Sequence, residues 1–142
     1  MLTLRVEQIR AFEATQLKHF EARLAARLAE MFPKEAAALR QGGSETDRYR
    51  ELLQKSMKRA ADYGLEYECD HAIFALLMLA NLRHGERDSR FLAWTAPLLT
   101  REATRGQVKM ALVEHGLRRR SEGDPRAAEL CRMIDKLHES FG

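Results

Sequence analysis

A nearly uninterrupted apolar run, Ala72–Ala80, constrains the fold of this chain more than any other feature. It holds about nine residues, whereas a membrane-spanning helix needs about 20 apolar residues in succession. A helix built from such a run is apolar on every face, so other helices must surround it. The run therefore predicts a central buried helix, which we expect to extend from about Tyr67 to Arg83, with Leu77 in the core.

The N-terminal part of the chain predicts one long amphipathic helix. Its apolar residues recur mostly at steps of three and four, which is the spacing of one helix face. These residues are Val6, Ile9, Leu17, Phe20, Leu24, Leu28 and Met31. Pro33 ends this helix, because proline lacks the amide hydrogen that the helical ladder requires. Roughly 27 residues at about 1.5 Å each make a rod near 40 Å long, enough to span the whole domain.

Glycine, proline and capping residues divide the remaining chain into shorter helices. The expected ranges are 34–40, 45–63, a short helix that Asp88 or Ser89 caps and Pro97 ends, 101–119 and 125–141. Gly64 is expected in the left-handed conformation after the helix at 45–63. Thr100 is the expected N-cap of the helix at 101–119, and Asp124 that of the last helix.

These elements together predict an all-α fold. Only three prolines and eight glycines interrupt the chain, and β-branched residues are scarce. We expect a compact multi-helix bundle with a long N-terminal helix and a central apolar helix. A length of 142 residues fits one domain. Within it we expect a helical core at 1–99 and a C-terminal helical pair at 100–142. Residues 118–124 are the best candidate for a linker, so the C-terminal part could be an appendage to the core.

Charge and cysteine content predict a cytoplasmic protein that binds neither nucleic acid nor membrane. With 24 basic and 21 acidic side chains the net charge is +3, far from the one-sided field of a dedicated nucleic-acid binder. The basic cluster Arg118–Arg120 lacks interleaved aromatic residues and is favourable at a helix C-terminus in any case. Residues 1–13 hold no apolar run of a secretory signal, and Cys69 and Cys131 are expected to be free, buried thiols.

The segment Glu66–His71 gathers side chains that could perform chemistry. A four-ligand zinc site would need a matching second pair of ligands, which the chain does not offer near this segment. Cys69 and His71 could form a nucleophile and its base, but residues two apart on a helix point in different directions. Acidic residues also favour a helix N-terminus without any ligand. We therefore predict no catalytic residue, no metal and no cofactor.

One aromatic and apolar cluster lies outside the long helices. It consists of Phe91, Trp94, Leu98 and Leu99, in a segment of broken helices near Pro97. Irregular segments lie at a domain surface, and tryptophan is enriched where proteins bind each other. We predict that this segment borders a groove for a protein partner, with Trp94 as an anchor. The alternative, that the same side chains close the core, stays open.

Two stretches carry a resemblance to a known family. The first begins at Arg5-Val6-Glu7-Gln8, continues through Phe20-Glu21-Ala22-Arg23-Leu24 and closes on Phe32-Pro33; the second is Arg59-Ala60-Ala61-Asp62-Tyr63-Gly64-Leu65 with Glu68, Asp70, Leu77 and Met78. Over residues 3–99 the chain resembles small helical proteins encoded in bacterial type VI secretion gene clusters, beside spike, effector and adaptor genes. The resemblance implies an accessory role and brings no catalytic residues with it.

The expected function is therefore non-catalytic binding of a protein partner, as a co-chaperone or adaptor partner that helps to load a type VI secretion effector. One alternative is an immunity protein that binds and neutralises a toxin. Another is a small helical enzyme or a nucleic-acid-binding regulator. A groove with apolar lining favours the first function, a surface of one charge the second, and a pocket lined by polar groups an enzyme.

Overall fold

The computed structural model describes residues 6–40, 48–84, 88 and 90–142, and these residues form helices and turns without any strand. The helices are α1 (Val6–Met31), α2 (Pro33–Arg40), α3 (Arg48–Asp62), α4 (Glu68–His84), the 3₁₀ turn η1 (Ala93–Thr95), α5 (Ala96–Leu99), α6 (Gly106–Arg120) and α7 (Pro125–Phe141). The predicted all-α fold is confirmed. Within the described ranges, every helix is too short or too polar to cross a membrane.

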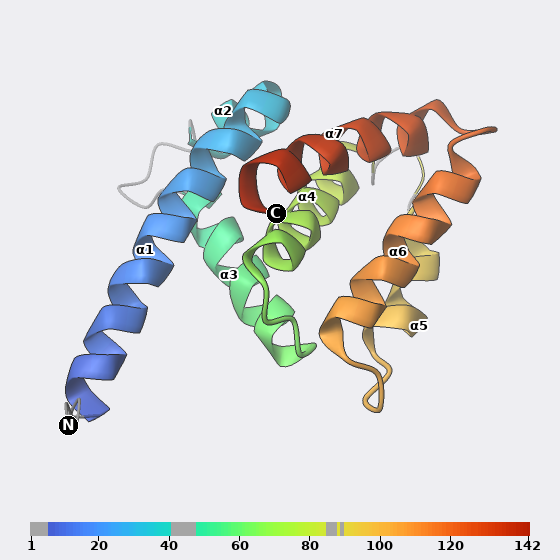
Figure 1. Cartoon of the computed structure of the whole chain (residues 1–142). Helices are drawn as coiled ribbons and strands as arrows, with labels where there is room; N and C mark the ends of the chain where they lie inside the picture. Colours follow the sequence, from blue (N-terminus) through green and yellow to red (C-terminus); the bar gives the residue numbers. More distant parts are fainter. Residues whose placement is uncertain (1–5, 41–47, 85–87, 89) are drawn as a thin grey trace.

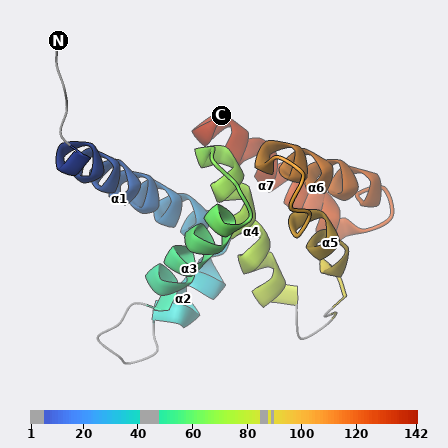
Figure 2. The same ribbon diagram turned by 90° about the horizontal axis from the view of Figure 1, so that it is seen from below.

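The central position of α4 follows from its apolar sequence. Figures 1 and 2 show α4 between α1, α2 and α3 on one side and α5, α6 and α7 on the other. Its residues from Ala72 to Ala80 are buried except the partly exposed Met78. Leu77 and Phe20, from α4 and α1, lie in the same core, so the prediction of a central buried helix is confirmed.

The long helix α1 is buried along only part of its length. Phe20, Leu24 and Leu28 lie in the core, whereas Leu17 of the same apolar stripe is 55% exposed. The apolar stripe of α1 is therefore covered over only part of its length. Figure 1 shows the reason: the N-terminal half of α1 extends away from the bundle, and α2, α3 and α4 pack against its C-terminal half.

The turn between α3 and α4 has the predicted glycine cap. Gly64 has φ +84°, and its amide donates to the carbonyl of Ala61 at 2.9 Å. The amide of Leu65 donates to the carbonyl of Ala60 at 3.0 Å, which completes the pair of backbone bonds that closes a helix C-terminus. At α7 the predicted start is also confirmed, since the Asp124 carboxylate accepts from the amide of Arg126 at 2.9 Å.

The segment between α4 and α6 differs from the prediction in detail. Pro97 lies in the first turn of α5 and does not end a helix, because the first turn needs no amide hydrogen from that residue. Thr100 closes α5: its hydroxyl donates to the carbonyl of Ala96 at 2.9 Å. The next helix, α6, begins at Gly106 and not at the predicted residue 101. Of the two expected caps for the short helix, Ser89 lies outside the described residues, and Asp88 accepts from the amide of Arg90 in a turn.

The C-terminal helices belong to the same core as the rest of the described chain. α7 packs on both α4 and α6, and it buries Ala127, Leu130, Cys131, Ile134 and Leu137. Arg83 at the end of α4 pairs with Glu35 of α2 and Glu129 of α7, each at 2.9 Å. Its hydrogen bond lowers the pKa of Glu35 below the ordinary value. Ionic and apolar contacts thus join residues 100–142 to residues 6–99.

Candidate functional site

An open groove of about 620 Å³ lies where η1 and α5 meet the C-terminal half of α6. Its lining joins aliphatic, aromatic and basic side chains: Trp94, Pro97, Leu98, Leu112, His115, Gly116, Arg119 and Arg120. Two of the four predicted partner-binding residues, Trp94 and Leu98, are part of this lining. The groove combines an apolar floor with a basic edge.

Trp94 is held on three sides and remains half-buried. Its indole Nε1 donates to the carbonyl of Phe91 at 3.1 Å. The Arg120 guanidinium carbon lies 3.9 Å from the ring centroid, which is the stacked geometry of a cation–π contact. The edge of the ring lies against Gly116, where a Cβ would be 2.7 Å from Cη2. Trp94 is therefore positioned by its neighbours and still has an exposed part on the groove.

The other two predicted partner-binding residues, Phe91 and Leu99, lie in the core at 7% and 6% exposure. The Phe91 ring packs edge-on against His84 and under the guanidinium of Arg126 at 4.2 Å. The four residues are thus divided, with two that close the core and two that face the groove. That a protein partner binds at Trp94 and Leu98 stays a prediction.

A small ionic network holds the segment that leads into η1. Arg126 pairs with Asp124 at 3.2 Å and with Asp88 at 3.3 Å, and it covers Phe91. Hydrogen bonds from the Arg90 amide and from Arg126 lower the pKa of Asp88. The hydrogen bond from Arg126 likewise lowers the pKa of Asp124. This network joins the N-terminus of α7 to the segment that carries Trp94.

The basic edge of the groove comes from the cluster at the end of α6. Arg118 pairs with Asp135 of α7 at 2.7 Å. In the part of the chain that the structure describes, no carboxylate pairs with Arg119 or Arg120, and none of the groove's lining residues is acidic. The sequence showed no aromatic residue near this cluster, whereas the fold brings Trp94 against Arg120. The groove is consequently positive, although the whole chain is nearly neutral.

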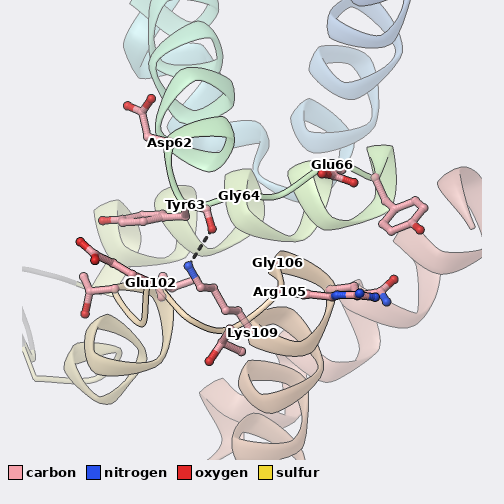
Figure 3. Close-up of a pocket in the computed structure, with 13 residues that line it drawn as sticks. Asp62, Tyr63, Gly64, Glu66, Glu102, Arg105, Gly106 and Lys109 are labelled. Carbon is pink, nitrogen blue, oxygen red and sulfur yellow. Dashed lines mark hydrogen bonds between the residues drawn. The ribbon is translucent and has the colours of Figure 1, made fainter.

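A second hollow of about 710 Å³ lies between the α3–α4 turn and the N-terminus of α6. Figure 3 shows Lys109 directed at the turn, where its ammonium donates to the Tyr63 carbonyl at 2.7 Å. Arg105 points away from this contact, and Glu66 and Glu102 lie at separate places on the rim. The charged groups of this hollow do not converge on one point, so it suggests no particular ligand.

Gly106, at the edge of this hollow, has no space for a side chain. A Cβ on Gly106 would lie 2.7 Å from the carbonyl carbon of Gly64, which is closer than the backbone allows. Lys109, buried at 4% exposure, adds its bond to a carbonyl at the C-terminus of α3, where cations are favourable. The N-terminus of α6 thus packs directly against the Tyr63-Gly64 turn.

The acidic segment Glu66–His71 forms the N-terminal end of α4 and its approach. His71 lies beneath Phe20, and its Nε2 is 2.8 Å from the carbonyl oxygen of Leu65. Cys69 makes its contact elsewhere: its Sγ lies 3.3 Å from Nδ1 of His138. The two cysteines are free, but Cys69 is only half-buried, so the expectation of a buried thiol holds for Cys131 alone.

Sequence reasoning missed the partner of Cys69, because His138 is 69 positions away in the chain. The packing of α7 on α4 brings the two together, and no local pattern in the sequence signals it. Among the described residues, no group of three or more His, Cys, Asp and Glu side chains is arranged to hold a metal ion.

Comparisons of the chain with family models, curated proteins and solved structures find no match. The resemblance to proteins of type VI secretion clusters therefore stays a prediction, and the groove must be interpreted from its own chemistry.

Proposed function

We propose that this chain is a protein-binding module that holds an acidic segment of a partner in the groove beside Trp94. The observation that carries the proposal is the combination of an aliphatic floor with Arg119 and Arg120, which no described carboxylate neutralises. Apolar contacts at the centre of an interface and charge complementarity at its rim are how proteins bind each other specifically. A segment with leucine-like side chains flanked by Asp or Glu fits both features.

Two observations favour a protein segment over a single-stranded nucleic acid. Single-strand binders stack bases on exposed aromatic faces, whereas Arg120 already covers one face of Trp94. The lining also includes the aliphatic side chains of Pro97, Leu98 and Leu112, which suit an apolar side chain better than a base. Binding of a single-stranded nucleic acid is therefore the alternative that the experiment below must distinguish.

The resemblance of residues 3–99 extends the proposal to a cellular role. We propose a cytoplasmic, non-catalytic accessory factor of a type VI secretion system, which binds an effector or its adaptor until loading onto the spike. An immunity protein would use the same surface. The two roles differ in whether a bound toxin loses its activity, which an assay of the toxin with and without this chain decides.

Calorimetry with a defined peptide tests the binding proposal. The probe is a short peptide with a pair of leucines flanked by glutamates, and its control has lysine at every glutamate. We expect saturable binding of the first peptide and none of the second. Arg119→Glu should weaken binding about tenfold, which corresponds to about 1.4 kcal/mol.

The matched control is Arg132→Glu, which makes the same charge change at an exposed position of α7 outside the groove. If both variants weakened peptide binding equally, the proposal would be contradicted, because the net charge of the protein and not the groove would then determine the affinity. Competition by a single-stranded oligonucleotide that survives about 200 mM salt would favour the nucleic-acid regulator instead.

A further inference from the structure

Three side chains from three helices form a hydrogen-bonded chain at the N-terminal end of α4. Cys69, the second residue of α4, places Sγ 3.3 Å from Nδ1 of His138 in the last turn of α7. Nε2 of the same imidazole lies 2.6 Å from Oε1 of Glu114 in α6. Figures 1 and 2 both show the C-terminal end of α7 beside the start of α4. This cluster is separate from the Trp94 groove.

The order of the three groups determines where the protons lie. An ionised Glu114 only accepts hydrogen bonds, so it takes the hydrogen on Nε2 of His138. Nδ1 is then the unprotonated nitrogen and accepts the thiol hydrogen of Cys69. A nucleophile, a base within hydrogen-bond reach and a third group that orients the base are the arrangement by which proteins activate weak nucleophiles.

The surroundings of the thiol are acidic. Asp70 of α4 and Glu114 of α6 both act on Cys69, and Glu68 lies beside it on α4. Arg23 of α1 pairs with Glu68 at 2.9 Å. His71 and His138 contribute the imidazoles nearest Asp70. An incoming anion would therefore be repelled, whereas a neutral or cationic molecule would not.

Burial keeps the thiol in its protonated form. Burial, followed by the carboxylates of Asp70 and Glu114, raises the pKa of Cys69 to about 11. Very little thiolate is then present at neutral pH, so any reaction of this sulfur needs a base that removes the proton during attack. His138 is the base that lies in position to do so.

We propose that Cys69 is a site of thiol–disulfide exchange with small neutral or cationic disulfides, in which His138 accepts the thiol proton and Glu114 positions His138. Sγ attacks one sulfur of the disulfide, a new S–S bond to Cys69 forms, and the disulfide's own S–S bond breaks. The thiol proton moves to Nδ1 of His138 and then to the leaving thiolate. Cys69 is oxidised to a mixed disulfide, and the leaving half is reduced to a thiol.

The test follows the modification of the full chain by a neutral disulfide, bis(2-hydroxyethyl) disulfide, near neutral pH. Digestion and mass spectrometry separate Cys69 from Cys131, so the buried Cys131 is the internal control. We expect Cys69 to react first. His138→Gln should slow its modification at least about tenfold, because a positioned base commonly contributes about 10²–10⁴. Glu114→Gln should slow it severalfold.

A purely structural role for His138 predicts the opposite result. Loss of its hydrogen bond alone would expose the thiol and leave the rate equal or higher, and that outcome would overturn the proposal. The pH profile gives a second readout: as the pH approaches about 11, hydroxide replaces the base and the rates of parent and His138→Gln should converge. A constant ratio across that range would also contradict the proposal.

The charge of the disulfide gives a third readout. We expect cationic cystamine to react faster than the neutral disulfide, and anionic dithiodiglycolate to react most slowly. The reverse order would show that the carboxylates around Cys69 do not select the reactant.

Discussion

At its N-terminal end α6 meets the α3–α4 turn through its backbone, whereas at its C-terminal end it meets Trp94 through side chains. Gly106 lies against Gly64 so closely that no side chain fits, and Lys109 bonds the Tyr63 carbonyl. At the other end, the side chain of Trp94 lies against Gly116. The two ends of α6 therefore differ in kind: the backbone contact at Gly106 leaves no space, whereas the side-chain contacts at Gly116 border an open groove.

The largest effect is expected at the rigid end. Gly106→Ala should lower the free energy of unfolding by about 1–3 kcal/mol, because the new Cβ meets backbone atoms that cannot move aside. Helix propensity alone predicts the opposite, a gain of up to about 1 kcal/mol for alanine. Urea denaturation measures the difference.

Gly123→Ala is the matched control, since nothing lies within 4 Å of a Cβ at that position. It should leave stability nearly unchanged. An alanine at 106 that is as well tolerated as the alanine at 123 would remove the distinction between the two ends of α6.

A smaller effect is expected from the same substitution at the open end. In Gly116→Ala the Cβ would lie 2.7 Å from Cη2 of Trp94, and the ring can shift to relieve the clash. Stability should fall by less than in Gly106→Ala, whereas the tryptophan emission of the free protein should change and peptide binding should weaken. Unchanged emission with unchanged binding would show that Trp94 does not depend on this contact.

The architecture could be predicted from the sequence because the signals that define its helices are local. The apolar run of α4 and the caps at Gly64 and Asp124 each act within a few residues, and each is found where it was predicted. Periodicity marks the apolar face that holds Leu17, but it does not tell whether a neighbouring helix covers that residue. Propensity likewise treated Gly106 as a weak helix residue, although its long-range contact with Gly64 requires glycine.

The candidate site was only half predictable for a related reason. The cluster around Trp94 was visible as a run of large apolar residues, but its division between core and groove depends on where α6 and α7 pack. The contact of Arg120 with Trp94 joins positions 26 apart, and that of Cys69 with His138 joins positions 69 apart. Contacts of this kind arise from tertiary packing and leave no spacing pattern in the chain.

The smallest effect is expected from acid, and it again concerns the groove end. Hydrogen bonds hold the pKa values of Asp88 and Asp124 below the ordinary value of 3.8, so the folded chain takes up these protons less readily than the unfolded chain. Their stabilisation is present above that value and is lost as the pH falls below it. Trp94 emission should change over this range, because Arg126 tethers the segment that carries Trp94.

Arg126→Gln should show the altered emission already at neutral pH. Asp135→Asn, which removes the carboxylate that pairs with Arg118, is the control and should behave as the parent protein does. A parent-like acid profile in Arg126→Gln would contradict the role of this network in holding the groove.

The most direct test of the central claim uses Trp94 itself, the only tryptophan in the chain. Its emission is followed while the peptide of leucines and glutamates is added, and then while the lysine control peptide is added. A segment seated in the groove removes water from the indole, so we predict a saturable blue shift with the acidic peptide and none with the control. Binding of the acidic peptide, detected by calorimetry under the same conditions, without any change in Trp94 emission would contradict the assignment of this groove as the binding site.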